Sequence, residues 1–307
     1  MVSSWSGGLT MLRDGEVRRE FEGLMTCGLA SDGAGGAYAV VDSGELWSYA
    51  PAGGWRRLAS SELPLRCCVA AAGRLYVGTD DARVLALEGE VLRPLDGLQA
   101  TAGHETWYAG AALVNGVLMG PPLGIRSISA TCDGRVLLAN VHVGGIPRSV
   151  DGGASWRPTL DIDLDVHEVS AHPSRPELVA AASAQGLCIS RDGGESWTVT
   201  THGLHAGYCS AVALTEDTLY VAASTDHFAA EGAVYRRRID SDGPLERVGG
   251  GLPAWLAGIA DTYCISARGD HLVIVDRSGA LYGSQNQGSS WSLWEQGLPS
   301  PSGVLIC

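Results

Sequence analysis

The chain has 307 residues, 45% of them hydrophobic, which is enough to bury one large core or two ordinary ones. A formal net charge of −13 and the absence of a basic stripe argue against a nucleic acid or an anionic membrane as partner. With 42 Gly, nine Trp and nine Tyr but only two Phe, the composition favours a β-protein with many turns over a helical one.

The N-terminal residues and the cysteines predict a location in the cytoplasm. No apolar stretch approaches the length of a membrane span, and residues 1–5 lack the basic and apolar regions of a signal peptide. The eight cysteines are then expected to be mostly reduced thiols rather than disulfides. Five of them fall in short apolar runs, where a thiol packs as a small hydrophobic group: Cys27, Cys67, Cys68, Cys209 and Cys264.

Short apolar runs bounded by glycine predict two β-units in the first third of the chain. Residues 24–60 form the first unit, and residues 64–98 form the second. Residues 99–124 break this pattern, because their Gly and Pro content predicts a loop insertion rather than a further unit. A loop of this length in a compact domain is usually functional or disordered.

An eight-residue motif then recurs along the chain. It lies at 149–156 and 190–197, at 284–291 with Asn in place of Asp, and in a weaker form at 48–55. The Asp can bond the backbone of the following residues and the glycines supply positive φ, so together they fix a tight turn between two strands. The Trp folds back and covers the turn with a large apolar surface. We expect each copy to be structural rather than catalytic.

The pattern Ser-x-Asp-x-Gly-x-x-Trp resembles the Asp-box, or BNR repeat, of sialidases and of many β-propellers that are not sialidases. In detail the chain is most similar to stand-alone bacterial propellers of the WD40/YVTN/BNR-like kind that are described as sialidase-like. This resemblance implies the β-propeller fold and leaves the chemistry open.

The spacing of the motif also indicates propeller blades of four short strands. Asp151 and Asp192 are 41 residues apart, and Asp192 and Asn286 are 94 apart, which is two steps of 47. One copy is missing near residue 235, where residues 240–244 predict a different turn. Further blades are expected to start near residues 125, 166, 207 and 262.

We therefore predict an all-β, seven-bladed β-propeller that fills residues 1–307 as a single domain. Residues 303–307 are expected to form the innermost strand of the last blade and residues 2–21 its other three strands. This arrangement closes the ring and removes exposed sheet edges. Six blades are the alternative, because residues 60–124 contain no Asp-box that sets the register.

In such a ring the loops divide between two faces, and the histidines favour one of them. Asp-box turns lie on the first face, whereas the second face collects the second-to-third turns and the links between blades. Ligand sites in propellers are usually on that second face. Six of the eight histidines are expected there: His104, His142, His167, His202, His205 and His227. We expect the insertion 99–124 to lie over the channel mouth on this face.

The 41-residue period places polar residues at the same mouth. Arg126, His167 and Tyr208 are successively 41 apart, so they are expected to start three adjacent inner strands, with Tyr263 as a counterpart in blade six. Asp161, Asp163, Asp165 and His167 alternate with apolar residues, so an extended segment would put all four on one side. The candidate catalytic residues are His167, Tyr208, Arg126 and Asp165, and the candidate ligand-binding residues are His142, His205, Tyr263, Trp107 and His104.

These residues leave a metal site and a metal-free pocket open as alternatives. His142, His167, His205 and Asp163 are a suitable ligand set for one divalent Zn, Mn, Fe or Cu ion, because imidazole and carboxylate bind such metals. No compact metal motif is present. Without a metal, Arg126 would anchor an anionic or carbonyl group and His167 would act as acid or base.

Our leading functional hypothesis is a small-molecule pocket at the channel mouth, with catalysis left open. The alternative is a non-catalytic ring that binds a protein, similar to assembly-factor-like propellers. A divergent sialidase-type glycoside hydrolase is a weaker third hypothesis. The resemblance to sialidases implies three clamping arginines, from Arg66, Arg83, Arg126 and Arg277, and a nucleophile at Tyr208 or Tyr263, but the early Arg-Ile-Pro element of true sialidases is missing.

Overall fold

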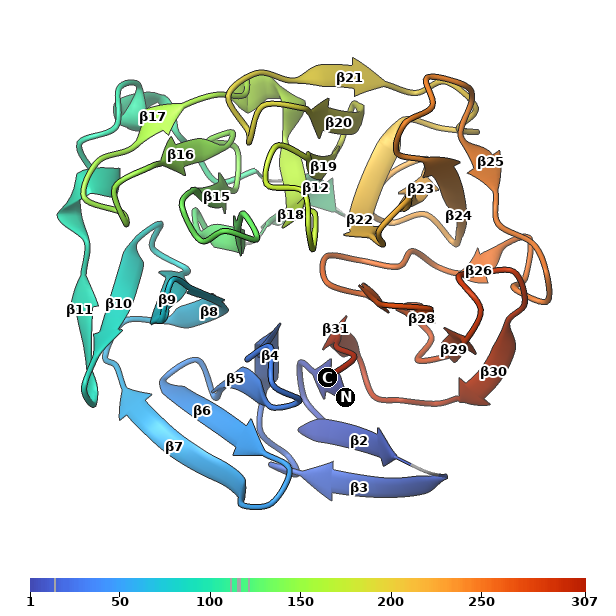
Figure 1. The fold of residues 1–307 in the computed structure, drawn as a ribbon, viewed down its shortest axis with the longest axis horizontal. Helices are drawn as coiled ribbons and strands as arrows, with labels where there is room; N and C mark the ends of the chain where they lie inside the picture. The colour runs from blue at the N-terminus through green and yellow to red at the C-terminus, as the bar shows by residue number, and fades with distance from the viewer. Residues whose placement is uncertain (14, 111, 115–116, 121) are drawn as a thin grey trace.

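The computed structural model describes residues 1–13, 15–110, 112–114, 117–120 and 122–307. Seven antiparallel sheets stand as blades around a central axis (Figure 1). In six of them four consecutive strands run outward from the axis in chain order, and the seventh combines both ends of the chain. The prediction of an all-β, seven-bladed propeller is therefore confirmed, and the six-bladed alternative is wrong.

The blades are numbered in chain order, with strands given from the axis outward. Blade 1 contains β4 (Thr26–Ser31), β5 (Ala37–Val41), β6 (Glu45–Ala50) and β7 (Gly54–Ser60). Blade 2 contains β8 (Leu65–Ala71), β9 (Arg74–Thr79), β10 (Val84–Glu88) and β11 (Val91–Pro94). Blade 3 contains β14 (Ile125–Ala130), β15 (Leu137–Val141), β16 (Pro147–Ser149) and β17 (Arg157–Pro158). Blade 4 contains β18 (Val166–Ala171), β19 (Val179–Ser183), β20 (Gly186–Ser190) and β21 (Thr198–Thr200).

The remaining three blades come from the last third of the chain and from its start. Blade 5 contains β22 (Tyr208–Leu214), β23 (Thr218–Ser224), β24 (Glu231–Arg238) and β25 (Glu246–Arg247), and β26 (Leu256–Ala257) pairs with β24. Blade 6 contains β27 (Ile265–Arg268), β28 (His271–Val275), β29 (Leu281–Ser284) and β30 (Ser292–Glu295). Blade 7 combines β31 (Pro301–Val304) with β1 (Val2–Ser4), β2 (Leu9–Arg13) and β3 (Glu16–Glu20).

The hydrophobic core lies between the blades, because each sheet packs both of its faces against neighbours. The second strands of blades 3 and 4 are accordingly short, mainly apolar runs rather than alternating ones, and every residue of β15 and β19 is buried. All eight cysteines are free thiols, and the five that were expected to pack as small hydrophobic groups are buried.

Blade 7 closes the ring with strands from both ends of the chain. β31 pairs with β1 so that Val304 lies opposite Val2. The Ser302 hydroxyl donates to the Thr26 carbonyl of blade 1 at 2.6 Å, which ties the closing strand to the next blade. The predicted closure is confirmed, although the strand covers Pro301–Val304 rather than residues 303–307.

The turn at Ser149–Trp156 shows how the repeated motif locks a hairpin. Ser149 Oγ accepts a hydrogen bond from the Gly153 N–H, and the Asp151 carboxylate accepts one from the Ser155 N–H, both at 2.9 Å. The Trp156 indole donates to the Gly153 carbonyl at 3.0 Å. Gly153 has a φ of 89°, which residues with a side chain rarely adopt. The expected turn geometry is confirmed, whereas a family relationship to BNR-repeat proteins stays a prediction.

The other copies of the motif differ in how well they follow this pattern. The bond from the glycine N–H to the serine hydroxyl recurs in 190–197 at 2.8 Å and in 284–291 at 2.9 Å. Residues 48–55 do not form such a turn, because β6 and β7 pair up to Gly54 and the Ser48 hydroxyl donates to the Arg56 carbonyl instead. The prediction of a fourth copy is therefore wrong. Blade 5 has a different turn between β24 and β25, as predicted.

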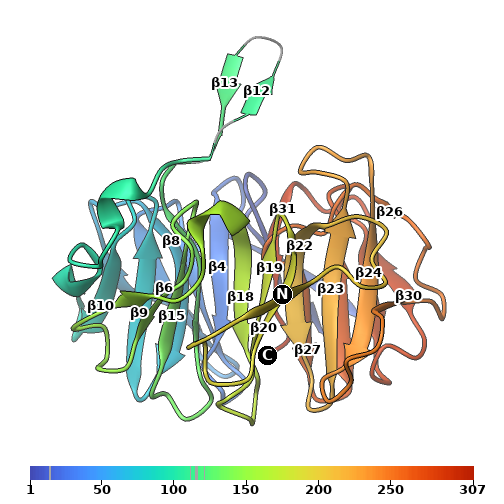
Figure 2. The same ribbon diagram turned by 90° about the horizontal axis from the view of Figure 1, so that it is seen from above.

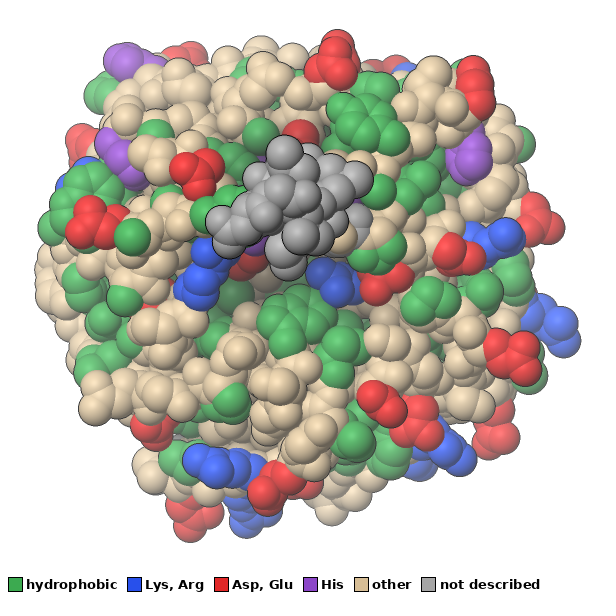
Figure 3. Space-filling model, turned by 180° about the vertical axis from the view of Figure 1, so that it is seen from behind, with side chains coloured by type: hydrophobic (Ala, Val, Ile, Leu, Met, Phe, Trp, Pro, Cys, Tyr) green, Lys and Arg blue, Asp and Glu red, His purple; other side chains and the backbone are tan. Residues whose placement is uncertain are grey.

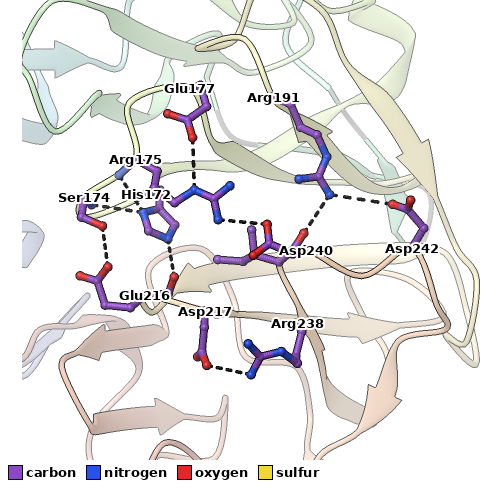
Figure 4. Close-up of polar contacts among 11 residues, drawn as sticks. His172, Ser174, Arg175, Glu177, Arg191, Glu216, Asp217, Arg238, Asp240 and Asp242 are labelled. Carbon is purple, nitrogen blue, oxygen red and sulfur yellow. Dashed lines mark hydrogen bonds and ion pairs between the residues drawn. The ribbon is translucent and has the colours of Figure 1, made fainter.

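On the face that carries the motif turns, polar contacts join blades 4 and 5 (Figure 4). Blade 5 has no motif Trp on this face. The ring of His172 accepts at Nδ1 from the backbone N–H of Arg175 at 3.0 Å and donates from Nε2 to the Glu216 carbonyl at 3.1 Å. The Arg175 guanidinium then lies 3.0 Å from the Asp240 carboxylate. Buried His172 thus connects the two blades at the centre of a network of exposed ion pairs.

The segment between β11 and β14 adds elements outside the blades. It contains two 3-10 turns, η1 (Asp96–Leu98) and η2 (His104–Thr106), and a hairpin of β12 (Ala112–Val114) and β13 (Val117–Met119). The hairpin projects from the face that carries the links between blades (Figure 2). That residues 99–124 act as a flap over the mouth stays a prediction. Across the described ranges, no helix has the length and apolar character needed to cross a membrane.

Candidate ligand site at the channel mouth

The channel mouth is the end of the axis at which the inner strands begin, on the face that carries the hairpin. Figure 3 shows this face, with cationic and acidic side chains near its centre. The sequence contains no lysine, so the cations are arginines. Charged groups of both signs therefore surround the axis on this face.

β-Bulges mark the start of the inner strands of blades 1 to 5, and that of β4 lies at Gly28 and Leu29. The ladders of β8, β14, β18 and β22 shift register at Arg66, Arg126, His167 and Ser210 respectively. A bulge leaves its extra residue outside the ladder and re-aims its side chain. These four positions are therefore equivalent around the axis. Tyr208 starts β22, as predicted, but it lies two residues before the bulge and so is not at the same ladder position as Arg126 and His167.

The chain before β18 is not extended. Residues Ile162–Leu164 form the 3-10 turn η3, and the Asp161 carboxylate caps it by accepting from the Asp163 N–H at 3.0 Å. Asp165 follows with a φ of 46°, which turns the chain into β18. The prediction that three aspartates and His167 line one side of an extended segment is therefore wrong, and of the three only Asp165 pairs with His167.

Asp165 lies between two histidines. Its Oδ2 is 3.7 Å from Nε2 of His167, and its Oδ1 is 4.0 Å from Nε2 of His142. Nδ1 of His167 lies 2.6 Å from the Cys209 carbonyl, and Nδ1 of His142 lies 3.3 Å from the Pro122 carbonyl. Because a carbonyl can only accept, we assign the proton to each Nδ1, which leaves Nε2 of a neutral ring as an acceptor.

Hydrogen-bond acceptors therefore converge around Asp165. Burial, followed by the charge of Arg126, lowers the pKa of His142 to about 4, so this ring is neutral at neutral pH. Burial raises the pKa of Asp165, but the neighbouring His167 ring and then the charge of Arg126 outweigh it, so the net pKa is lowered. Asp165 Oδ1 is buried and has no hydrogen-bond partner among the described residues. Such an acceptor calls for a donor from a water or a ligand.

Tyr208 packs against His167, with ring centroids 4.5 Å apart. Burial raises the pKa of Tyr208, so its hydroxyl keeps its proton. This residue is therefore a wall of the site and a possible hydrogen-bond donor rather than an ionised nucleophile.

Arg126 lines a small cavity on the axis, of about 40 Å³. The Arg66 guanidinium contributes to the same wall and lies 4.3 Å above the Trp5 ring. Burial raises the pKa of Asp261, but the charges of Arg126 and then of His227 outweigh it and lower the net pKa. Arg126 itself has no hydrogen bond or ion pair within the described part of the chain. The cavity is large enough for water alone, so a larger ligand would lie in the open mouth.

Tyr263 lines this cavity and reaches from the start of blade 6 to blade 3. Its backbone adopts a φ of 64°, and its hydroxyl accepts from the Ile128 N–H of blade 3 at 3.1 Å. Its own N–H donates to Glu168 Oε2 at 3.0 Å. Sequence reasoning missed Glu168, although a single acid inside the apolar run of β18 was a usable signal. Tyr263 therefore connects blades 3, 4 and 6 in addition to lining the cavity.

Several of the predicted site residues make contacts away from Asp165. His205 bonds through Nδ1 to the Tyr235 hydroxyl at 2.7 Å, and its ring lies against Trp255 with centroids 4.8 Å apart. His104 and Trp107 pack on each other in the insertion, with centroids 4.7 Å apart, and Trp107 is buried against the core of blades 2 and 3. None of these contacts brings the three residues to Asp165.

The four residues proposed as metal ligands are His142, His167, His205 and Asp163. The described residues contain no group of three or more His, Cys, Asp or Glu side chains arranged to hold a metal ion. His205 is engaged with Tyr235, and the Asp163 backbone carbonyl accepts from the Gln185 side chain at the exposed turn η3. Metal binding by this chain stays a prediction for direct measurement.

Comparison with known proteins bears on the fold alone. No protein-family model matches the chain, and no curated protein matches it. Among solved structures, a GH74 enzyme of Niastella koreensis has 13% identity and a TM-score of 0.62 over 95% of this chain and 46% of that one. YCF48 bound to D1 peptide has 14% identity and a TM-score of 0.57 over 92% and 86% of the two chains. The WD40 propeller domain of Doa1 has 11% identity and a TM-score of 0.62 over 94% and 86%.

These similar structures include both enzymes and non-enzymatic propellers. The chain spans less than half of the length of the Niastella koreensis enzyme and of an ancestral GH74 enzyme. At such identities the likeness shows a propeller and does not assign its chemistry.

Proposed function

We propose that the channel mouth binds a small polar molecule through an anionic or carbonyl group held by Arg126. The observation that carries this proposal is the guanidinium of Arg126, which has no hydrogen bond or ion pair with any described residue and offers several N–H donors at the bulge of β14. Planar guanidinium groups bind carboxylates and phosphates with two parallel hydrogen bonds, which gives such a site its selectivity.

The opposite wall of the site would recognise a hydrogen-bond donor on the same ligand. Nε2 of His142, Nε2 of His167 and Oδ1 of Asp165 are all acceptors without a donor among the described residues. The ligand would therefore combine an anionic group with a hydroxyl or amine. His167 would be placed to take a proton from that group, with Asp165 stabilising the imidazolium.

A thermal-shift screen of hydroxy- and amino-carboxylates, followed by calorimetric titration, tests this proposal. The Arg126→Gln variant is expected to lose at least about tenfold in affinity for a hit, because a charge-assisted pair is removed. Arg135→Gln is the matched control, since Arg135 is 85% exposed on the link between β14 and β15, at the other end of the blade. Equal affinity in wild type and Arg126→Gln would place the ligand elsewhere.

A divalent metal is an alternative occupant of the same acceptors. Mass spectrometry of the purified, untagged protein would detect Zn, Mn, Fe or Cu. About one equivalent that is lost in His167→Ala would make the metal part of the site, and the titrations would then be repeated with that metal present.

Binding of a protein partner is the second candidate function, because exposed aromatic side chains gather in loops of the same face. Trp5, Tyr108, Phe228 and Trp255 are 38%, 52%, 60% and 40% exposed. Aromatic residues are enriched at protein interfaces, and the similar structure of YCF48 was solved with a peptide bound. Under this function a Phe228→Ser and Trp255→Ser double variant would lose its partner in affinity capture, whereas Arg126→Gln would retain it.

A further inference from the structure

A groove of about 640 Å³ lies on the opposite face, between the β24–β25 turn of blade 5 and the motif turn of blade 6. Its volume is in the range of small-molecule pockets. Arg236 and Arg237 line one side of it, and Asn286, Gln287 and Ser289 line the other. The groove is separate from the channel mouth, so binding in the groove is independent of the function proposed for the mouth.

Blades 3 and 4 show which group occupies the equivalent place elsewhere in the ring. Arg148 pairs with Leu138 in blade 3, and Arg236 pairs with Tyr220 in blade 5. In each blade, Leu138 or Tyr220 is the residue that follows, along the second strand, the last pair between the first and second strands. The two arginines are therefore at equivalent positions of their blades. Each also donates to a carbonyl of the next motif turn: Arg148 to Gly193 at 2.8 Å, and Arg236 to Gly288 at 3.2 Å.

The surroundings of the two arginines differ in three respects. The carbonyls that they contact, of Gly193 and Gly288, stand one motif position apart. Arg148 has Arg157 as its ladder partner, whereas Arg236 has Glu246. The third difference is a carboxylate partner. Arg148 lies 3.5 Å from the carboxylate of Glu195, which also contacts Arg157. Glu195 is the third residue after Asp192 of its motif, and the third residue after Asn286 is Ser289. A hydroxyl-bearing residue therefore stands at the motif position of that carboxylate, and Arg236 forms no ion pair with any described residue.

The acidic residues of the groove are engaged or lie beyond reach of Arg236. Asp217 pairs with Arg238 at 2.9 Å, and Asp270 accepts from the Gln287 side chain at 2.6 Å. Glu246 lies opposite Arg236 in the β24–β25 ladder, but it is exposed and is not within ion-pair distance of that guanidinium. Glu246 and Asp270, whose partner is a neutral amide, are the carboxylates of this lining that would compete with an incoming anion.

We infer that this groove binds a small carboxylate-bearing molecule, whose carboxylate occupies against Arg236 the place that Glu195 occupies against Arg148. A carboxylate suits the planar fork of guanidinium better than a spherical anion does. Arg237, whose side chain donates to the Gly243 carbonyl at 3.2 Å, adds a second positive charge to the same lining.

Calorimetric titration with succinate and with citrate tests the inference, in a low-salt buffer free of carboxylates and phosphate. The titration uses the Arg126→Gln background, which lacks the anchor proposed for the channel mouth. Saturable binding at one site per chain is expected there, and the added Arg236→Gln change should weaken it by at least about tenfold. Ser289→Glu should abolish it as well, because the new side chain supplies the missing carboxylate, and this variant should melt at or above the wild-type temperature. Ala154→Glu introduces the same charge at the equivalent exposed position of blade 3 and should leave binding unchanged.

Two results would overturn the inference. One is the absence of saturable binding of both probes to the protein that carries Arg126→Gln alone. The other is unchanged affinity in a folded Ser289→Glu variant, which would place the anion away from Arg236. Glu246→Gln is expected to raise the affinity for the probes, because it removes a competing carboxylate. A lower affinity in this variant would count against the site.

Discussion

Glu168 in the inner strand of blade 4 accepts a hydrogen bond from the backbone N–H of Tyr263, 95 residues further along the chain, at 3.0 Å. The same Oε2 accepts from the Val212 N–H of blade 5 at 3.2 Å. Burial raises the pKa of Glu168 to about 8. A carboxyl group that keeps its proton thus joins blade 4 to blade 5 and to the link before blade 6.

Glu168→Gln is expected to remove a pH dependence of stability. Between pH 4.5 and about 8 the folded state keeps the Glu168 proton while the unfolded state has released it, so the wild type loses stability as pH rises. From pH 6.5 to pH 8 this loss is roughly 2 kcal/mol. The neutral amide accepts the same two backbone bonds, so the variant should lack this loss.

Urea unfolding at pH 6.5 and pH 8 measures the difference. The low pKa of His142 acts in the opposite direction, because the unfolded ring is half protonated at pH 6.5 while the folded ring is neutral. This contribution is only about 0.4 kcal/mol over the range, and it is the same in wild type and variant. Glu62→Gln, at an exposed position between β7 and β8, should keep the wild-type pH dependence. Identical pH slopes in Glu168→Gln and wild type would show that Glu168 is ionised in the folded protein.

The fold could be predicted from the sequence because each blade is a local unit that repeats. The motif turns at Asp151 and Asp192 are fixed by hydrogen bonds within five residues, so the sequence reports them directly. A period in the low forties then counts the blades. For the same reason the sequence also predicted that blade 5 has a different turn in place of the motif.

The site was harder to predict because its geometry depends on backbone irregularities. Counting by 41 residues equates His167 with Tyr208, but the bulge that re-aims the side chain in β22 lies at Ser210. Alternation predicts an extended strand before His167, whereas capping by Asp161 and the positive φ of Asp165 produce a turn. Neither feature has a periodic signature, and both decide which side chains meet.

Asp192→Ala is expected to destabilise the fold through a single turn. The Asp192 carboxylate accepts from the backbone N–H groups of Glu195 and Ser196, at 3.0 and 2.9 Å. Loss of bonds to a charged acceptor should lower the free energy of unfolding by about 1–3 kcal/mol. Asp192→Asn should cost less, because Asn286 in blade 6 accepts the equivalent bond at 2.9 Å. Urea unfolding curves of the two variants that coincide would contradict this role of the carboxylate.

Deletion of residues 303–307 tests whether the closing strand holds the ring together. It removes Val304, which is 6% exposed and pairs with Val2, and the bond from the N-terminal ammonium to the Leu305 carbonyl. Burial of a valine and two or three ladder bonds correspond to about 3–5 kcal/mol. For a chain of this size that is a fall in melting temperature of roughly 5–8 °C.

Deletion of Cys307 alone is the control for that truncation. Cys307 lies beyond β31, so its removal leaves the pairing with Val2 and the bond at Leu305 in place and should leave the melting temperature nearly unchanged. Because β1 would become an unpaired inner edge in the longer deletion, that variant should also self-associate, which light scattering would detect. A ring that melts normally without residues 303–307 would mean that β1 to β3 close against blade 6 by side-chain packing alone.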